Sequence, residues 1–288
     1  MNPDSPECDE ELEEGAGPRP LRRVAVLPAI LTLAGIFCGF GALSYAAGGQ
    51  YANSAKLILI AMLFDSLDGK IARLMKMTSS FGAHLDSLAD VISFGVAPAF
   101  LALRFAGGTL YHPSGNLPVA FSASLLHPAK WIWTISMLYI MAAALRLARF
   151  NIESDEDVRS HNAFRGLPTP AAAGVVASII LLVHYIKDDH PDIGFDPILI
   201  AAWAMPFLTM TLGILMVSRV RYVHLFNILT KEQKPFFFLV EIIFAGVLIA
   251  VIPEVALAIV FSLYVLSGLG TWIADRVRGR TPQEETIF

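Results

Sequence analysis

The sequence predicts an all-α protein, a polytopic bundle that crosses a membrane about eight times. Of its 288 residues, 55% are hydrophobic and only 16% are charged. The apolar residues fall in long blocks rather than in the short amphipathic runs of a soluble domain. A stretch of about 20 apolar residues spans a bilayer as a helix, because only a helix satisfies its own backbone hydrogen bonds there.

Eight blocks of this length follow one another along the chain. They cover residues 24–48, 55–75, 82–105, 131–150, 169–186, 197–217, 235–252 and 254–275. No long linker separates them and no repeat at a solenoid period is visible, so we expect one membrane domain over residues 21–280. The longest break, at 106–130, is rich in Gly, Pro and Ser, which indicates an exposed loop.

The two ends of the chain differ from these blocks. Seven acidic residues fall in the first 14 positions, MNPDSPECDEELEE, and such a segment has too little apolar content to fold. We therefore expect a disordered tail over residues 1–20 and a short tail over 281–288, both cytoplasmic. The acidic start also argues against a cleaved signal peptide, which begins with basic residues. Cys8 and Cys38 are too few for a disulfide framework or a metal site.

Positive charge is distributed asymmetrically over this pattern of helices. If both termini are cytoplasmic, 17 of the 21 Lys and Arg residues lie on the cytoplasmic side, where such residues accumulate in membrane proteins. The far side keeps Lys56, Arg104, Lys130 and Lys187. We therefore expect an even number of spans in the inner membrane of the cell, with both termini in the cytoplasm.

Four aspartates interrupt the second and third blocks, in the stretch FDSLDGKIARLMKMTSSFGAHLDSLAD. Asp65 and Asp68 are three residues apart and Asp86 and Asp90 are four apart, so each pair lies on one helix face. With a turn near MKMTSSF, a rise of about 1.5 Å per residue puts Asp65 level with Asp90 and Asp68 level with Asp86. We therefore expect a hairpin that brings the four carboxylates together.

Carboxylates are expensive inside a membrane. One acid at the centre of a membrane helix costs about 2.5 to 3.5 kcal/mol, so four cost on the order of 10 kcal/mol before their repulsion is added. Protonation offsets part of this cost, and so does binding of hard divalent cations, because Mg²⁺ and Mn²⁺ prefer carboxylate oxygens. Two such cations would neutralise Asp65, Asp68, Asp86 and Asp90.

The residues between the aspartates fit a metal-bound phosphate better than a proton relay. Gly69, Ala72 and Gly82 remove side-chain bulk and leave room for a ligand near the backbone. Lys70 and Arg73 lie one turn towards the cytoplasm, where a guanidinium can grip phosphate oxygens. Small residues also allow close helix packing in membranes, so this second explanation of the glycines and the alanine stays open.

The complete pattern is Asp-x-x-Asp-Gly-x-x-Ala-Arg, eight residues, then Gly-x-x-x-Asp-x-x-x-Asp. It resembles the signature of the CDP-alcohol phosphatidyltransferases, membrane enzymes that move a phosphatidyl group from a CDP-linked lipid to an alcohol and release CMP. The resemblance implies that Asp65, Asp68 and Asp86 hold one Mg²⁺ or Mn²⁺ ion, that Asp86 and Asp90 hold a second, and that Asp90 also deprotonates the attacking hydroxyl. Four further positions would bind the CDP portion of the lipid: Gly69, Ala72, Arg73 and Gly82.

Three other segments resemble the phosphatidylserine synthase branch of this family: LPAILTLAGIFCGF, ALRLARFNIES and FRGLPTPAAAG. The branch usually has Asn where this chain has Ala29, and Thr32 is carried over as a contact to the CDP-lipid. The resemblance implies transfer from CDP-diacylglycerol to L-serine, within membrane lipid and by a homodimer. Glycerol 3-phosphate, inositol phosphate and choline are the alternative acceptors. No nucleic-acid partner is expected.

Basic residues after the fourth block are candidates for the acceptor or phosphate site. Arg146 and Arg149 share a helix face, and Asn151 and Arg165 follow them. A guanidinium would bind a serine carboxylate or the lipid diphosphate, but anchoring by snorkelling side chains explains the same arginines, and both interpretations stay open. His84, a lone histidine inside the motif, is expected to be packed or interfacial.

Other classes of protein explain less of the sequence. An intramembrane prenyltransferase also holds a diphosphate with aspartates and Mg²⁺, but it needs a second Asp-rich motif, and none is visible. An ion-coupled transporter would carry ions on buried acids, but inverted repeats with broken helices are not visible either. A scaffold with a fortuitous metal site leaves the complete signature unexplained.

Overall fold

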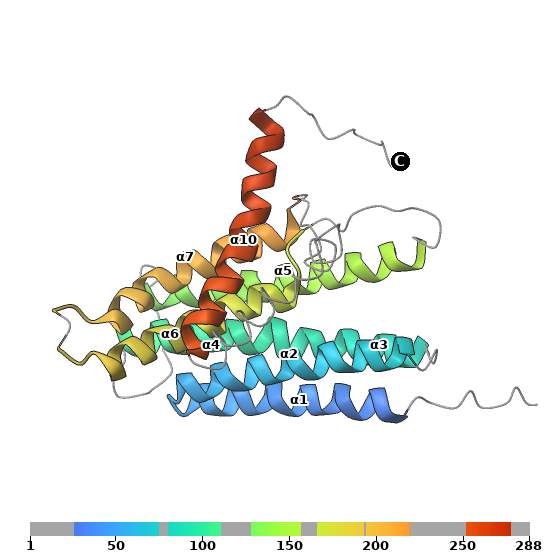
Figure 1. The fold of residues 1–288 in the computed structure, drawn as a ribbon, viewed down its shortest axis with the longest axis horizontal. Helices are drawn as coiled ribbons and strands as arrows, with labels where there is room; N and C mark the ends of the chain where they lie inside the picture. The colour runs from blue at the N-terminus through green and yellow to red at the C-terminus, as the bar shows by residue number, and fades with distance from the viewer. Residues whose placement is uncertain are drawn as a thin grey trace, which may run out of the picture.

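The structure is a computed structural model, and it describes residues 26–74, 80–110, 128–156, 166–192, 194–218, 220 and 252–277. Every regular element in these ranges is a helix. Figure 1 shows most of the helices lying side by side, whereas α10 points away from the others towards the C-terminus. The expected all-α membrane fold is confirmed, because six described segments are long and apolar enough to cross a membrane.

These six segments correspond to six of the eight expected blocks. They are Leu27–Ala47, Phe81–Leu110, Lys130–Ile152, Thr169–Asp189, Pro197–Val217 and Pro253–Gly270. The second expected block is also a helix, α2 (Tyr51–Leu74), but it carries the first two motif aspartates and is less apolar. The seventh block lies almost wholly outside the described residues, as do both expected tails and most of the 106–130 loop.

A glycine turn joins α1 (Val26–Ala47) to α2. Gly49 has a φ of 77°, and the N–H groups of Gly49 and Gln50 donate to the carbonyls of Ala46 and Tyr45 at 3.1 and 2.9 Å. This is a Schellman arrangement, in which glycine adopts the left-handed conformation without a steric penalty. The short turn makes α1 and α2 an antiparallel pair in contact, and this pair forms one wall of the site described below.

The third span consists of three consecutive segments: α3 (Ser80–Asp90), the π-helix η1 (Val91–Val96) and α4 (Ala97–Leu110). The sequence led us to expect one uninterrupted helix here. In η1 the N–H of Ala97 donates to the carbonyl of Ile92, five residues earlier, whereas an α-helix bonds four residues back. Pro98 follows directly, and a proline ring in a regular α-helix clashes with the carbonyl four residues before it.

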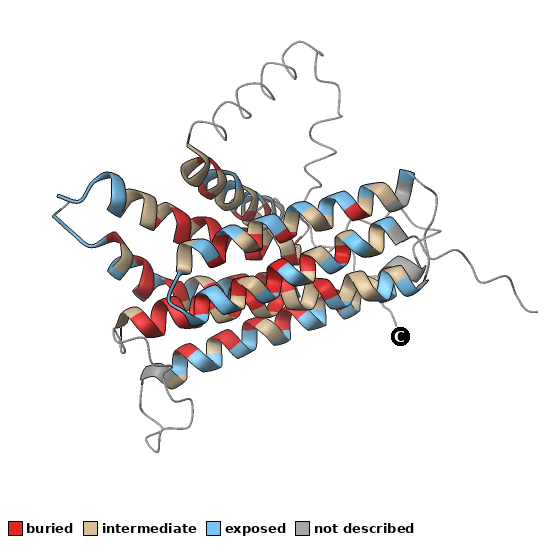
Figure 2. Cartoon of the chain, turned by 90° about the horizontal axis from the view of Figure 1, so that it is seen from below, coloured by how far each residue is buried: buried red, intermediate tan, exposed pale blue. Residues whose placement is uncertain are grey.

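Most of α4 is buried by its neighbours. Figure 2 shows buried residues gathered where the helices face one another and exposed residues on their outer faces. The outer faces carry large apolar side chains, such as Phe37 and Phe40 on α1 and Phe207 on α7. Such faces are stable in lipid, which is as apolar as the side chains themselves.

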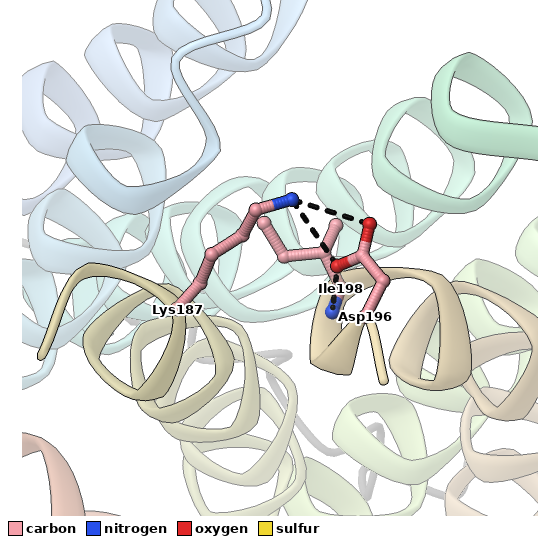
Figure 3. A network of polar contacts seen from close by, with 3 residues as sticks. All are labelled: Lys187, Asp196 and Ile198. Carbon is pink, nitrogen blue, oxygen red and sulfur yellow. Dashed lines mark hydrogen bonds and ion pairs between the residues drawn. The ribbon is translucent and has the colours of Figure 1, made fainter. Parts of the chain in front are cut away.

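The next two helices, α6 (Thr169–Asp189) and α7 (Pro197–Val217), form a pair. A segment that contains proline and glycine links the two helices by polar contacts at each end of the pair. At one end, Lys187 Nζ lies 3.2 Å from both carboxylate oxygens of Asp196, which also accepts the Ile198 N–H at 3.1 Å (Figure 3). At the other end, Gly166 has a φ of 94° and donates its N–H to the Val220 carbonyl at 2.8 Å. A Cβ on Gly166 would lie 2.5 Å from a backbone oxygen, so only glycine fits.

Two more helices complete the described bundle: α5 (Pro128–Glu156) and α10 (Pro253–Val277). α5 packs against η1, α4 and α7, and α10 packs against α6. The α6–α10 contact depends on Gly174, because a Cβ at this position would lie 2.4 Å from the Phe261 ring. Because α6 also packs against α2, the motif hairpin is supported by α5 and α6, which come much later in the chain.

Candidate active site

The four motif aspartates line one small cavity between α1, α2 and the third span. Asp65, Asp68 and Asp86 each place one carboxylate oxygen within 4.8 Å of the others. Asp90 lines the same cavity, close enough to Asp65 for the two carboxyl groups to interact. The hairpin therefore brings together acids that lie about 20 residues apart, with Asp65 beside Asp90 as the rise per residue predicted.

The rest of the cavity wall consists of small and hydroxyl-bearing residues and one aromatic ring. They are Thr32, Gly35, Ala61, Ala89, Ser93 and Phe94. A Cβ built on Gly35 would meet no atom within 4 Å, so the α1 side of the cavity leaves space beside the carboxylates. These small side chains allow a ligand to approach the acids closely.

Asp68 is the most buried of the four aspartates, with 4% of its surface exposed. The Thr32 hydroxyl lies 3.0 Å from the Pro28 carbonyl oxygen and donates to Asp68 Oδ2 at 2.8 Å. This bond holds the carboxylate in one orientation and leaves it further lone pairs for a cation. Thr32 also lines the cavity, so its expected contact with the CDP-lipid stays a prediction.

The chemistry of the donor set fits a hard divalent cation. Asp65, Asp68 and Asp86 repel one another in an apolar surrounding, where charge interactions are stronger than in water. Carboxylate oxygens are the ligands that Mg²⁺ and Mn²⁺ prefer. An Asp cluster able to bind a metal ion is therefore present, and the family described below generally uses divalent metals.

Several predicted site residues lie around this cluster without lining the cavity. Gly69 and Gly82 are half-buried on α2 and α3, and His84 is exposed on α3, so it is not packed among the described helices. Ala72 and Arg73 belong to α2, but their side chains are outside the described part of the structure. Arg165 lies outside the described residues altogether.

The end of α5 reaches the motif helix. Asn151 Nδ2 donates to Ser87 Oγ on α3 at 3.0 Å, so this residue, expected at the acceptor or phosphate site, links the two helices. The Arg146 guanidinium stacks over the Phe150 ring at 5.4 Å from its centroid, and its charge acts on Asp90. Arg149 is half-buried on the same helix. Arg146 is thus the predicted acceptor residue whose charge the structure connects with the cavity.

Apart from Thr32, the sequence did not identify the residues of α1 and η1 that line the cavity. Thr32, Gly35 and Gly39 recur at the spacing of one helix face, and this pattern was the available signal. A Cβ on Gly39 would lie 2.7 Å from Ser93 Oγ, so the glycine lets α1 approach η1. Ser93 had no comparable signal, because its position depends on contacts between helices far apart in the sequence.

Comparisons with known proteins agree with this geometry. The family model described as CDP-alcohol phosphatidyltransferase matches residues 25–215. A CDP-diacylglycerol--serine O-phosphatidyltransferase of Helicobacter pylori is 32% identical over 88% of this chain and 94% of its own length. A Methanocaldococcus jannaschii protein of the same name is 32% identical over 70% of this chain and 76% of its own. The archaetidylserine synthase of Methanothermobacter thermautotrophicus is 32% identical over 68% of this chain and 69% of its own.

The matched region begins just before α1 and ends near the close of α7. It therefore contains every residue that lines the aspartate cavity, together with the helices that support it. Since the match covers well over half of the chain, and since several relatives align over most of their length, the chain belongs to the CDP-alcohol phosphatidyltransferase family.

Proposed function

We propose that this protein transfers the phosphatidyl group of CDP-diacylglycerol to L-serine, giving phosphatidylserine and CMP for phospholipid biosynthesis. The observation that carries the proposal is the convergence of Asp65, Asp68, Asp86 and Asp90 on one cavity. Similarity to a relative named for this reaction over 88% of the chain supports the choice of substrates.

The four acids have distinct proposed roles. Asp65, Asp68 and Asp86 hold one divalent cation, and Asp86 and Asp90 hold a second, as Mg²⁺ or Mn²⁺. When bound, the cations supply positive charge that stabilises the diphosphate and the departing CMP. Asp90 accepts the proton of the serine hydroxyl as general base. The hydroxyl oxygen then forms a bond to the phosphorus of the phosphatidyl group while the bond from that phosphorus to CMP breaks.

The CDP portion of the lipid binds on the cytoplasmic side of the aspartates in this proposal. Gly69, Ala72 and Gly82 leave the backbone accessible, and Arg73 pairs with phosphate oxygens. Gly35 adds open space on the α1 wall. Thr32, which lines the cavity and donates to Asp68, contacts the lipid in this proposal.

The acceptor site is proposed around Arg146. Its charge acts on Asp90 and its guanidinium is steadied on Phe150, so a serine carboxylate bound there would lie near the base. A phosphorylated acceptor would bring a second dianion beside a diphosphate and four aspartates, which requires further cations. Arg149 and Arg165 are proposed as phosphate contacts, and Asn151 holds α3 in place.

The proposed setting is the inner membrane, with both termini in the cytoplasm. Placing 17 of 21 basic residues on one side supports this orientation. The catalytic domain spans residues 21–280 between cytoplasmic tails at 1–20 and 281–288, and two copies form a homodimer. A cysteine introduced at Met77 should be labelled only from the cytoplasmic face, and light scattering in detergent should give twice the mass of one chain.

The acceptor is tested directly by offering one radiolabelled alcohol at a time to purified protein with CDP-diacylglycerol and Mn²⁺. We expect phosphatidylserine and CMP from L-serine, and no product from glycerol 3-phosphate, inositol phosphate or choline. An Asp86→Asn preparation made in the same way corrects for host enzymes. Product from a phosphorylated acceptor with none from serine would overturn the acceptor and leave the family unchanged.

A further inference from the structure

The π-helix η1 lies directly between Asp90 and the buried helix α4. In a regular α-helix the N–H of residue 98 would satisfy the carbonyl of Phe94. Pro98 has no N–H, and its ring would clash with that carbonyl. The wider turn, in which Ala97 bonds to Ile92, relieves this conflict. Such turns inside α-helices are frequent at functional sites.

The extra residue in η1 determines which way the motif helix faces. One residue corresponds to about 100° of rotation and about 1.5 Å of rise in an α-helix. α4 is fixed in the bundle by its buried side chains, and Arg104 Nη2 donates to the Ala47 carbonyl of α1 at 3.1 Å. If η1 became regular α-helix, α3 would have to rotate against this anchor. Asp86 and Asp90 would then turn away from α2.

Tyr139 on α5 supplies the donor that Pro98 lacks. Its hydroxyl donates to the Phe94 carbonyl oxygen at 3.4 Å. This distance is long for an O–H···O bond, but only 1% of the Tyr139 surface is exposed, and a buried hydroxyl needs an acceptor. The bond ties the Phe94 carbonyl, and with it η1, to α5, so a rotation of η1 into another register would have to break it.

Contacts from two neighbouring helices hold the same segment. Ser93 Oγ donates to the Gly35 carbonyl of α1 at 3.1 Å, at the place where Gly39 allows close approach. On the other side, a Cβ on Gly95 would lie 3.4 Å from the Ala143 Cβ of α5. η1 is therefore held between α1 and α5 in one orientation.

We infer that η1 sets the rotational register that turns Asp86 and Asp90 towards Asp65 and Asp68, and that Tyr139 is a positioning residue that maintains it. The inference rests on the proposed roles of the aspartates as metal ligands and base. It assigns a function to a residue of α5 that lies outside the motif and makes no contact with the acids through its hydroxyl.

The first test is Tyr139→Phe, with Tyr51→Phe as the matched control. Both remove a tyrosine hydroxyl that donates to a backbone carbonyl, but the Tyr51 bond, to Arg104 at 3.0 Å, lies at the other end of α4. We expect Tyr139→Phe to weaken Mn²⁺ binding about 10-fold and to lower kcat about 10-fold to 100-fold. Mn²⁺ binding is measured by electron paramagnetic resonance, without substrates. Tyr51→Phe should leave both quantities unchanged.

The second test is Pro98→Ala, which restores the missing N–H and makes the regular α-helix accessible. We expect a thermal unfolding temperature at least equal to that of the unchanged protein, but Mn²⁺ binding about 10-fold weaker. General damage to the fold cannot produce this combination. Pro206→Ala, which also removes a proline from a helix interior, is the control and should bind Mn²⁺ normally.

The proposed function and the register inference are overturned by different outcomes. If the unchanged protein binds no Mn²⁺, the proposed function fails and the register inference fails with it. If the unchanged protein binds Mn²⁺ and both Tyr139→Phe and Pro98→Ala bind it equally tightly, only the register inference fails. It also fails if Tyr51→Phe or Pro206→Ala loses as much Mn²⁺ affinity as its matched variant.

Discussion

Two buried charged regions in the bundle are compensated in opposite ways. Arg104, with 1% of its surface exposed, donates from Nη2 to the Ala47 carbonyl at 3.1 Å and from Nε to the Ala46 carbonyl at 3.5 Å. Both carbonyls belong to the last turn of α1, where the helix carries partial negative charge. The C-terminus of α1 therefore offsets part of the charge of this arginine.

Tyr51, at the start of α2, donates to the Arg104 carbonyl and so marks the position of Arg104 along this helix. Asp65 in the aspartate cavity comes 14 residues later on α2, or about 21 Å away by the rise of the helix. Here the carboxylates of Asp65, Asp68 and Asp86 face one another. The Thr32 hydroxyl and the charge of Arg146 offset part of this negative charge. The two regions illustrate two uses of a buried charge: backbone carbonyls of α1 hold the charge of Arg104 in place, whereas the clustered carboxylates could bind a cation.

Removing a carboxylate from the cavity should have the largest effect on activity. We expect Asp68→Asn and Asp86→Asn each to lower kcat/KM about 10³-fold or more, because several kcal/mol of metal-dependent stabilisation are lost at about 1.36 kcal/mol per factor of ten. In the absence of metal, the two variants should unfold at the same temperature as the parent protein or above it, since repulsion among the remaining carboxylates is reduced. Activity and thermal unfolding in detergent check both statements.

Metal removal is the companion measurement for these variants. A chelator should abolish activity of the parent protein, and Mg²⁺ or Mn²⁺ should restore it. Full activity after exhaustive metal removal would contradict the proposed role of the cavity.

Asp90→Asn separates catalysis from metal binding inside the same cavity. We expect transfer to slow about 10² to 10⁴-fold, the usual range for loss of a general base, with affinity for CDP-diacylglycerol better preserved than kcat. Equilibrium binding of the lipid and steady-state kinetics provide the two numbers. An equally large loss of lipid affinity would show that Asp90 acts chiefly as a ligand.

The hairpin that carries the four aspartates was predictable from sequence, whereas the contacts from other helices that hold it in place were not. The rise per residue placed Asp65 opposite Asp90 because the two spans share a short turn, so local geometry was sufficient. The positions of Thr32 and Tyr139 depend on packing between helices separated by tens of residues, which periodicity does not report. Pro98 inside an apolar span was the one local signal of an irregular helix. Asn151 was predicted as an acceptor or phosphate contact because it follows Arg146 and Arg149 in the sequence, and its bond to Ser87 could be seen only in the tertiary structure.

Arg104→Met should lower stability and leave activity unchanged, which is the reverse of the result expected for the aspartate variants. The carbonyls of Ala46 and Ala47 lose a buried donor, so the free energy of unfolding should fall by about 1 to 3 kcal/mol. The kcat of the folded fraction should stay unchanged, because the cavity is remote. Arg104→Lys keeps a charge but not the guanidinium fork. Its free energy of unfolding should lie between those of the parent protein and Arg104→Met. A loss of kcat without a loss of stability would show that the two regions are coupled.

Thr32→Val tests whether a neutral donor contributes to the acidic region. The valine keeps the shape of the side chain but cannot donate to Asp68 Oδ2, so we expect Mn²⁺ affinity to fall about 10-fold, as for other groups that orient a metal ligand. Thr32→Ser should restore most of the affinity, because it returns the hydroxyl. If the Thr32→Val and Thr32→Ser variants bind Mn²⁺ equally tightly, the hydrogen bond from residue 32 does not orient the Asp68 carboxylate.

The smallest effect is expected where a charge is exposed rather than buried, at Asp196. Slight burial raises the pKa of Asp196, but hydrogen bonds from Lys187 and the Ile198 N–H lower it more, so the net pKa lies below its ordinary value of 3.8. A carboxyl whose pKa is lower in the folded state stabilises the fold above its ordinary pKa, and this contribution is lost as the pH falls through the folded value. Asp196→Asn should therefore lower the unfolding temperature at pH 7 by less than about 2 °C, since exposed ion pairs contribute little.

The pH dependence isolates this contribution from the acids of the cavity. The difference in unfolding temperature between the parent and Asp196→Asn should be constant from pH 7 to about pH 5 and should vanish as the pH approaches 2. Taking a difference removes the titration of the four cavity aspartates, which both proteins share. Lys187→Met removes the ion pair but keeps the bond from Ile198, so it should retain part of the pH dependence. A difference that persists at pH 2 would mean that Asp196 stabilises α7 through its shape and hydrogen bonding rather than through its charge.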